Sequence, residues 1–131
     1  MKLFTHVVIS GCCAIAAGCA GPQPNVSREF PPDATPIGAQ ALKDRLSGRS
    51  FTVRLAGGGA ADLNYGADGR YSIRLSSGES DQGSWRTEES RVCVTYKGHF
   101  PSGCAQVHAT ADRLYSKRAN TGEVLLMIPR P

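Results

Sequence analysis

Residues 70–108 read RYSIRLSSGESDQGSWRTEESRVCVTYKGHFPSGCAQVH, and this stretch decides the fold class. Within residues 71–75 every second side chain is Tyr, Ile or Leu, and polar residues separate them. Residues 51–55 repeat the pattern with Phe, Val and Leu. An apolar residue at every second position predicts a strand that is buried on one face and exposed on the other.

Segments of this kind, separated by short sequences rich in turn-forming residues, continue to the end of the chain. The predicted strands cover residues 51–55, 62–65, 70–75, 82–87, 92–97, 104–108, 113–117 and 123–128. Eight short strands predict a mainly all-β fold, a small antiparallel meander that either closes into an eight-stranded barrel or packs as a two-sheet sandwich. One short helix is predicted before them, because apolar residues recur at helical spacing from Ile37 to Leu46 and Gly48 follows.

Two cysteines indicate how two of these strands pair. We expect the strands around them to form a hairpin in which Cys93 lies opposite Cys104. Val92 then lies opposite Ala105, so the cysteines share one face of the sheet and the apolar residues share the other. We therefore predict a Cys93–Cys104 disulfide, which an oxidising compartment favours over two free thiols.

The amino terminus has the features of a secretory signal peptide. Residues 1–18 contain one lysine, then an apolar stretch without Asp, Glu, Lys or Arg, then small residues. The stretch is too short for a membrane span, which needs about 20 apolar residues. It ends in Ala16-Ala17-Gly18-Cys19, which resembles the lipobox of bacterial lipoproteins. The alternative is an ordinary signal peptide cut at an Ala-x-Ala-like site.

The lipobox resemblance implies that Cys19 begins the mature protein and carries diacylglycerol together with an amide-linked acyl chain such as palmitate. More than one acyl chain gives stable membrane attachment, because each buried CH₂ contributes roughly 0.8 kcal/mol. Ala20 follows the cysteine, which by the same resemblance implies sorting to the outer membrane of a Gram-negative cell, with the domain facing the periplasm.

Three regions follow from these assignments. Residues 1–18 form the signal peptide, residues 19–37 a lipidated cysteine and Pro-rich tether, and residues 38–131 the antiparallel β-domain. Five of the eight prolines lie in the tether, so we expect it to be extended and to pack against little. Phe30 within it is interpreted as a contact either to the domain or to a partner.

The chain offers few groups for catalysis. It has 131 residues, enough for one ordinary domain, and beyond the predicted signal peptide its histidines are His99 and His108. The sequence has no HExxH motif and no paired CxxC motifs. Glu88 and Glu89 are adjacent, and adjacent residues point to opposite faces of a strand, which disfavours a carboxylate pair. We therefore predict no enzyme, no catalytic residue, no cofactor and no metal.

The net charge of +4 raises the question of an anionic partner. The arginines of interest are Arg54, Arg70, Arg74 and Arg86, expected on one exposed sheet face. Such a face is a candidate surface for lipopolysaccharide, peptidoglycan or nucleic acid, although arginines on a sheet face are more often simply solvated. The envelope location disfavours nucleic acid as the partner.

Four residues are expected to have structural roles. Trp85 is the only tryptophan, and we expect it to fill the core with its indole N–H bonded to a carbonyl. Gly83 precedes it in the same predicted strand, and Phe51 and Tyr71 lie at apolar positions of two others.

The spacing of several residues resembles that of small exported β-domains of Gram-negative bacteria, many of unknown function. The residues that carry this resemblance are Leu46-Ser47-Gly48, Phe51, Asp68-Gly69-Arg70, Gly83-x-Trp85, Cys93 and Cys104. More loosely, the chain is similar to the bacterial metalloprotease-inhibitor lipoproteins, which are lipocalin-like eight-stranded barrels. That similarity implies an extended amino-terminal segment that enters a protease cleft, with residues 25–36 as the candidate.

The first function hypothesis is a non-enzymatic, lipid-anchored envelope lipoprotein whose β-domain binds a protein or another envelope component. The alternatives are a periplasmic metalloprotease inhibitor and a lipocalin-like carrier of a small ligand. The carrier needs an interior cavity, on the order of several hundred Å³. We expect instead a barrel plugged by its own side chains, namely Phe51, Leu55, Tyr71, Ile73, Leu75, Trp85, Val94 and Leu126.

Overall fold

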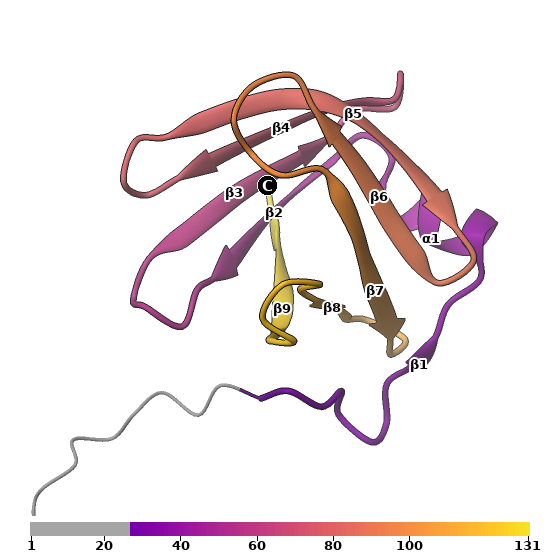
Figure 1. The fold of residues 1–131 in the computed structure, drawn as a ribbon. Coiled ribbons are helices and arrows are strands. Elements are labelled where there is room, and N and C mark those ends of the chain that lie inside the picture. The colour runs from indigo at the N-terminus through magenta and orange to yellow at the C-terminus, as the bar shows by residue number, and fades with distance from the viewer. Residues whose placement is uncertain (1–26) are drawn as a thin grey trace, which may run out of the picture.

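Each of the eight predicted segments forms a strand, and the strands close into an antiparallel barrel (Figure 1). The structure is a computed structural model that describes residues 27–131. The predicted signal peptide and Cys19 lie outside the described residues. The barrel strands are β2 (Arg49–Arg54), β3 (Ala60–Tyr65), β4 (Arg70–Leu75), β5 (Ser80–Glu88), β6 (Arg91–Tyr96), β7 (Gly103–Ala109), β8 (Leu114–Lys117) and β9 (Val124–Arg130).

Each strand pairs with the next one along the chain, and β9 returns to pair with β2. This last pairing places Phe51 opposite Pro129 and closes the ring. The predicted all-β meander is therefore confirmed, and of the two architectures considered it is the barrel that forms. Closure leaves none of the eight strands with an unpaired edge along its whole length, which removes a template for aggregation.

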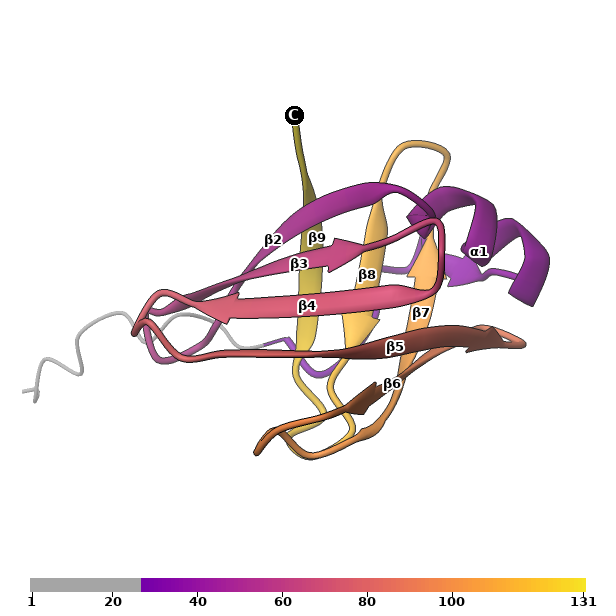
Figure 2. The ribbon, with the colours of Figure 1, turned by 90° about the horizontal axis from the view of Figure 1, so that it is seen from above.

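The two ends of the barrel differ. The hairpin loops at residues 55–59, 76–79, 97–102 and 118–123 lie at one end, which we call the mouth. The opposite end, the closed end, carries the remaining turns and the helix α1 (Ala39–Leu46). Figure 2 shows α1 at the end opposite the β2–β3 and β4–β5 hairpins.

The helix α1 seals the closed end because its apolar side chains enter the barrel. Leu42 and Leu46 are fully buried. Two hydrogen bonds hold the helix in place: the Arg45 guanidinium donates to the Thr110 carbonyl at 2.9 Å, and the Thr87 hydroxyl donates to the Ala39 carbonyl at 2.9 Å. Gly48 follows the helix, where the sequence predicts its end, and its φ of 72° turns the chain into β2.

Aromatic side chains fill the half of the barrel next to α1. Phe51, Tyr71 and Trp85 are all buried. Tyr65 lies between them, and its ring meets the ring of Trp85 edge to face at 5.4 Å. The Trp85 indole N–H donates a 2.9 Å hydrogen bond to the carbonyl of Gly66.

The segment that precedes α1 crosses the outside of the barrel. The Ser27 carbonyl accepts a 2.8 Å hydrogen bond from the Val124 N–H, and the Phe30 ring stacks on His108 with centroids 3.7 Å apart. The short strand β1 (Thr35–Pro36) then pairs with β7. The expectation that the Pro-rich stretch packs against little is therefore wrong from Ser27 onward, because backbone pairing and an aromatic contact hold this part against the domain. Phe30 contacts the domain itself.

One predicted core residue faces outward. Leu126 in β9 is 38% exposed, whereas Leu125 and Met127 on either side of it are buried. Alternation is absent from the continuous apolar run at 124–128, so the sequence does not reveal which residues point inward. Among the described residues, no helix combines the length and apolar character required to cross a membrane.

Candidate functional site

The half of the barrel next to the mouth is hollow. It contains a cavity of about 490 Å³, within the range of pockets that hold small ligands. Most of its wall is apolar, with side chains from β2, β3, β4, β6 and β9, including Val53, Leu63, Tyr71, Ile73, Val94 and Leu125. The mouth loops at 97–102 and 118–123 contribute to its rim. The expectation of a plugged barrel is therefore wrong for this half.

Small side chains explain why the cavity remains open. Ala61, Ala105 and Ser116 line it on β3, β7 and β8, where larger residues would fill the space. An eight-stranded barrel is just wide enough for its inward side chains to fill it, so a few small residues leave room for a ligand. Leu126, which was expected to help to fill the interior, points to the outside instead.

Tyrosine hydroxyl groups bring hydrogen-bonding capacity into this apolar wall. Tyr65, Tyr71 and Tyr96 all line the cavity. Burial raises the pKa of each of these phenols above its usual value, so the hydroxyls stay protonated at physiological pH. The hydroxyl oxygens of Tyr71 and Tyr96 lie 3.4 Å apart, longer than an ordinary O–H···O hydrogen bond. These groups are therefore able to bind a polar group of a ligand.

Arg118 and Glu123 form a partly buried ion pair at the mouth. Arg118 lines the cavity, and its Nη1 atom lies 3.5 Å from Glu123 Oε2. The Arg118 side chain is 37% exposed and that of Glu123 only 8%. The backbone also joins them, because the Arg118 N–H donates to the Glu123 carbonyl at 2.9 Å. The pair fixes a guanidinium at the edge of the cavity.

Asp81 orders the loop at 97–102. Its carboxylate accepts backbone hydrogen bonds from Gln82 at 2.7 Å, Gly98 at 2.9 Å and Phe100 at 3.1 Å. Burial raises the pKa of the carboxyl, but these three N–H groups and the nearby His99 outweigh burial, so the pKa lies below its ordinary value. Sequence reasoning missed Asp81, although an acidic residue at an inward position, two before Gly83, was a detectable signal.

We expect acid to loosen this loop. Because the pKa of Asp81 is lowered in the folded protein, its hydrogen bonds stabilise the fold above the unfolded pKa of about 3.9. This stabilisation is lost as the pH falls through the folded pKa. Asp81→Asn should therefore be less stable than wild type at pH 7, with the difference shrinking below about pH 4. Urea unfolding of both proteins from pH 2 to 7 measures this, and parallel pH curves would contradict it.

The four arginines singled out in the sequence, Arg54, Arg70, Arg74 and Arg86, all lie on the outer face of the barrel and are exposed. They do not form a free basic patch. Arg70 pairs with Asp68 at 3.4 Å and Arg86 pairs with Glu88 at 3.5 Å, both near the closed end. Arg54 and Arg74 lie near the mouth, at the other end of the barrel from Arg70 and Arg86.

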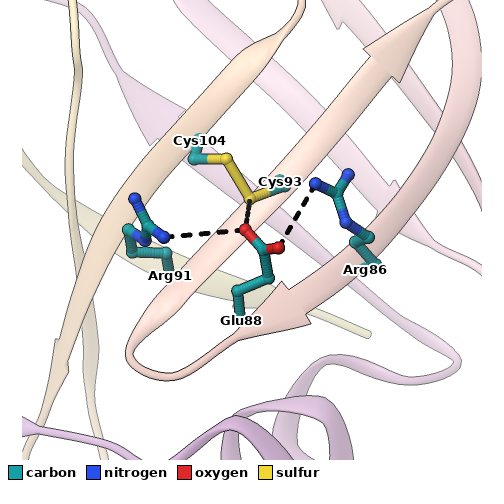
Figure 3. Close-up of a disulfide and its surroundings, with 5 residues drawn as sticks. All are labelled: Arg86, Glu88, Arg91, Cys93 and Cys104. Carbon is teal, nitrogen blue, oxygen red and sulfur yellow. Dashed lines mark hydrogen bonds and ion pairs between the residues drawn. A yellow bond between two sulfur atoms is a disulfide. The ribbon is translucent and has the colours of Figure 1, made fainter.

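The predicted disulfide links β6 to β7 on the outer face (Figure 3). Cys93 lies opposite Cys104, and the neighbouring pair is Val92 with Ala105, so the predicted register is confirmed. Glu88 lies against the bridge, with Oε2 3.4 Å from Cys93 Sγ. A disulfide sulfur has no proton to donate, so this is a contact and not a hydrogen bond.

Glu88 and the two cysteines place their ligand atoms within 4.8 Å of one another. The two sulfurs are bonded to each other and are therefore not thiolates, so the group does not serve as a metal site in this oxidation state. Glu88 instead lies between two arginines, 3.5 Å from Arg86 and 3.6 Å from Arg91. The arrangement is a surface ion-pair cluster beside a structural bridge.

The two histidines considered in the sequence lie apart from the cavity wall. His108 is on the outer face of β7 under the Phe30 ring, and its Nδ1 atom is buried without a hydrogen-bond partner among the described residues. His99 is exposed in the loop at 97–102. The cavity is thus lined mainly by apolar side chains and phenols, and its charged groups are the guanidinium of Arg118 and the carboxylate of Glu79, a set that is suited to binding.

Comparison of the chain with known protein families, with curated proteins and with solved structures found no match.

Proposed function

We propose that this protein is a lipid-anchored envelope protein whose barrel binds a small, mainly apolar ligand without catalysing a reaction. The observation that carries the proposal is the cavity of about 490 Å³ at the mouth. Its opposite end is sealed by α1, so a ligand has one route in and out. An apolar pocket with a few polar groups is the usual form of a small-ligand site.

The proposal keeps one part of the first hypothesis and favours one of its alternatives. The ligand is an envelope component, and the mode of binding is that of a small-ligand carrier. The geometry gives less support to a protease inhibitor. The described part of the segment that would enter a protease cleft, from Ser27 to Pro36, lies against β7 and β9, where hydrogen bonds and the Phe30–His108 stack hold it.

The lipid anchor is supported by the lipobox at 16–19 and by the hydrophobic stretch before it. The anchor places the barrel at a membrane, where apolar ligands are concentrated. Mass spectrometry of the mature chain should show an acylated Cys19, and Cys19→Ala should abolish the acylation. A chain that is still acylated after this substitution would contradict the assignment.

Ligand binding can be tested with N-phenyl-1-naphthylamine, an uncharged apolar fluorophore. The full chain carrying Cys19→Ser lacks the anchor and so avoids background from lipid. We expect saturable binding of the fluorophore, and Ala105→Phe should weaken it about tenfold, or 1.4 kcal/mol, because the added ring occupies the cavity. Gln106→Phe is the matched control, since the neighbouring residue is exposed on the outer face.

The outcome that overturns this function is specific. Binding that does not saturate, or that survives Ala105→Phe unchanged while thermal unfolding shows both variants to be folded, would exclude the cavity as the site. If Ala105→Phe does not fold, Ala105→Leu replaces it in the test. Leucine adds less volume to the cavity and should also weaken binding.

A further inference from the structure

The mouth carries an excess of positive charge. The side chains at the strand ends and loops of the mouth include five cations and two acids: Arg54, Arg74, Lys97, Lys117 and Arg118 against Glu79 and Glu123. We call the five cations the basic rim, although Arg54 and Arg74 point to the outer face of the barrel and the Lys117 ammonium lies 5.9 Å from the centroid of the Phe30 ring. Two more acids lie at this level: Asp81 stays ionised, because backbone hydrogen bonds lower its pKa, and Asp62 lies opposite Arg74. The cations therefore outnumber the acids by five to four, a small excess of positive charge at the entrance.

Arg118 is the member of the basic rim that lines the cavity. The structure shows one contact from its guanidinium to the Glu123 carboxylate, at 3.5 Å. A guanidinium has five N–H donors, so most of its hydrogen-bonding capacity remains for a second anion. Glu123 is nearly buried and acts as a positioning residue that holds the guanidinium over the apolar wall.

The amino-terminal segment first contacts the barrel close to this rim. Ser27 is bonded to Val124, which directly follows the mouth loop at 118–123. Seven residues lie between Cys19 and Ser27, and the eight steps from one to the other, at roughly 3.5 Å each, span less than about 30 Å. A lipid on Cys19 therefore holds the mouth within a short distance of the membrane surface.

Resting on the proposed function, we infer that the ligand is a single-chain amphiphile with an anionic headgroup. Its apolar chain lies in the cavity against the aliphatic and aromatic wall, and its carboxylate or phosphate lies at the basic rim within reach of Arg118. The ligand's alkyl chain supplies affinity because it is buried in the cavity. The headgroup sets the ligand's orientation, because the basic rim lies at the end of the barrel that α1 does not seal.

A comparison of dodecanoate with dodecanol separates the contribution of headgroup charge to affinity from that of the alkyl chain. Both ligands have twelve carbons, and dodecanoate alone is charged. Each would compete with N-phenyl-1-naphthylamine on the full chain carrying Cys19→Ser, at pH 8 and low salt. We expect dodecanoate to bind about tenfold more tightly than dodecanol, and we expect salt to reduce this preference.

Variants then assign the preference to the rim. Arg118→Gln should weaken dodecanoate binding about tenfold and leave dodecanol unchanged, and Arg118→Lys should keep part of the preference. Arg70→Gln is the matched control, because Arg70 is an exposed arginine at the closed end. A dodecylphosphate arm tests whether phosphate serves as well as carboxylate.

Each outcome has a distinct meaning. If the fluorophore and both competitors fail to bind, the proposed function itself is wrong. If dodecanoate and dodecanol bind equally and Arg118→Gln changes neither, the cavity stands as a binding site but the anionic headgroup is excluded. If Arg118→Gln weakens dodecanol as much as dodecanoate, the arginine supports the shape of the mouth and the inference is likewise overturned.

Discussion

Replacing Gly83 with alanine should lower the free energy of unfolding by about 3 kcal/mol or more. A Cβ atom at this position would overlap the Thr95 carbonyl oxygen and lie 2.8 Å from its carbonyl carbon and 3.0 Å from Tyr96 Cα. These are backbone atoms of the paired strand β6, so relief requires the strands to separate. Urea unfolding, followed by circular dichroism, measures the loss.

The position of Gly83 in the barrel explains why its neighbours cannot yield. Gly83 lies between Tyr71 of β4 and Tyr96 of β6, and their rings meet edge to face at 5.6 Å. A side chain on β5 would separate β5 from β6 beside this contact. Gly103→Ala is the matched control, since a Cβ there meets nothing within 4 Å, and its stability should change little. Equal stabilities for the two variants would contradict the prediction.

Removing the disulfide with Cys93→Ala and Cys104→Ala should cost about 3 kcal/mol in the chain-entropy model. The bridge spans a sequence separation of 11 and links β6 to β7 beside the mouth loop at 97–102. For a domain of this size, 1 kcal/mol corresponds to about 4 to 8 °C in Tm, so we expect a fall of roughly 12 to 24 °C. Thermal unfolding with and without reductant measures the same effect in the wild-type chain.

The single variant Cys104→Ala provides the control for this prediction. Either single substitution breaks the bridge, so it should reproduce most of the loss seen in the double variant. The ion pairs around Glu88 are exposed and should contribute little of the total. A Tm that does not change on reduction would show that the bridge does not limit the stability of the barrel.

The local pattern predicted the strands well because each strand has one buried face. Tyr71, Ile73 and Leu75 alternate with polar residues, and this alternation alone specifies a strand and its inward side. The pairing of Cys93 with Cys104 followed from parity, since a shift by one residue would place Val92 on the wrong face. In β9 the run from 124 to 128 has no polar residues to mark a side, and there Leu126 was assigned wrongly.

The candidate site was less predictable because it depends on distances between strands far apart in the sequence. Arg118 and Asp81 gave no motif, and their importance follows from the loops that the barrel brings to one end. The arginines that the sequence singled out share an outer face, but two of them pair with acids near the closed end. Sequence spacing does not show such pairing across turns.

The all-β class, the eight strands, the helix that precedes them and the disulfide register were predictable, because these features depend on local periodicity and on parity between neighbouring strands. Whether side chains fill the barrel was not predictable from local pattern. The volume left inside depends on how many inward residues from opposite walls meet at each level. Inward side chains from opposite walls meet around Phe51 and Trp85. Around Ala61, Ala105 and Ser116 they are too small to meet, and a cavity is left.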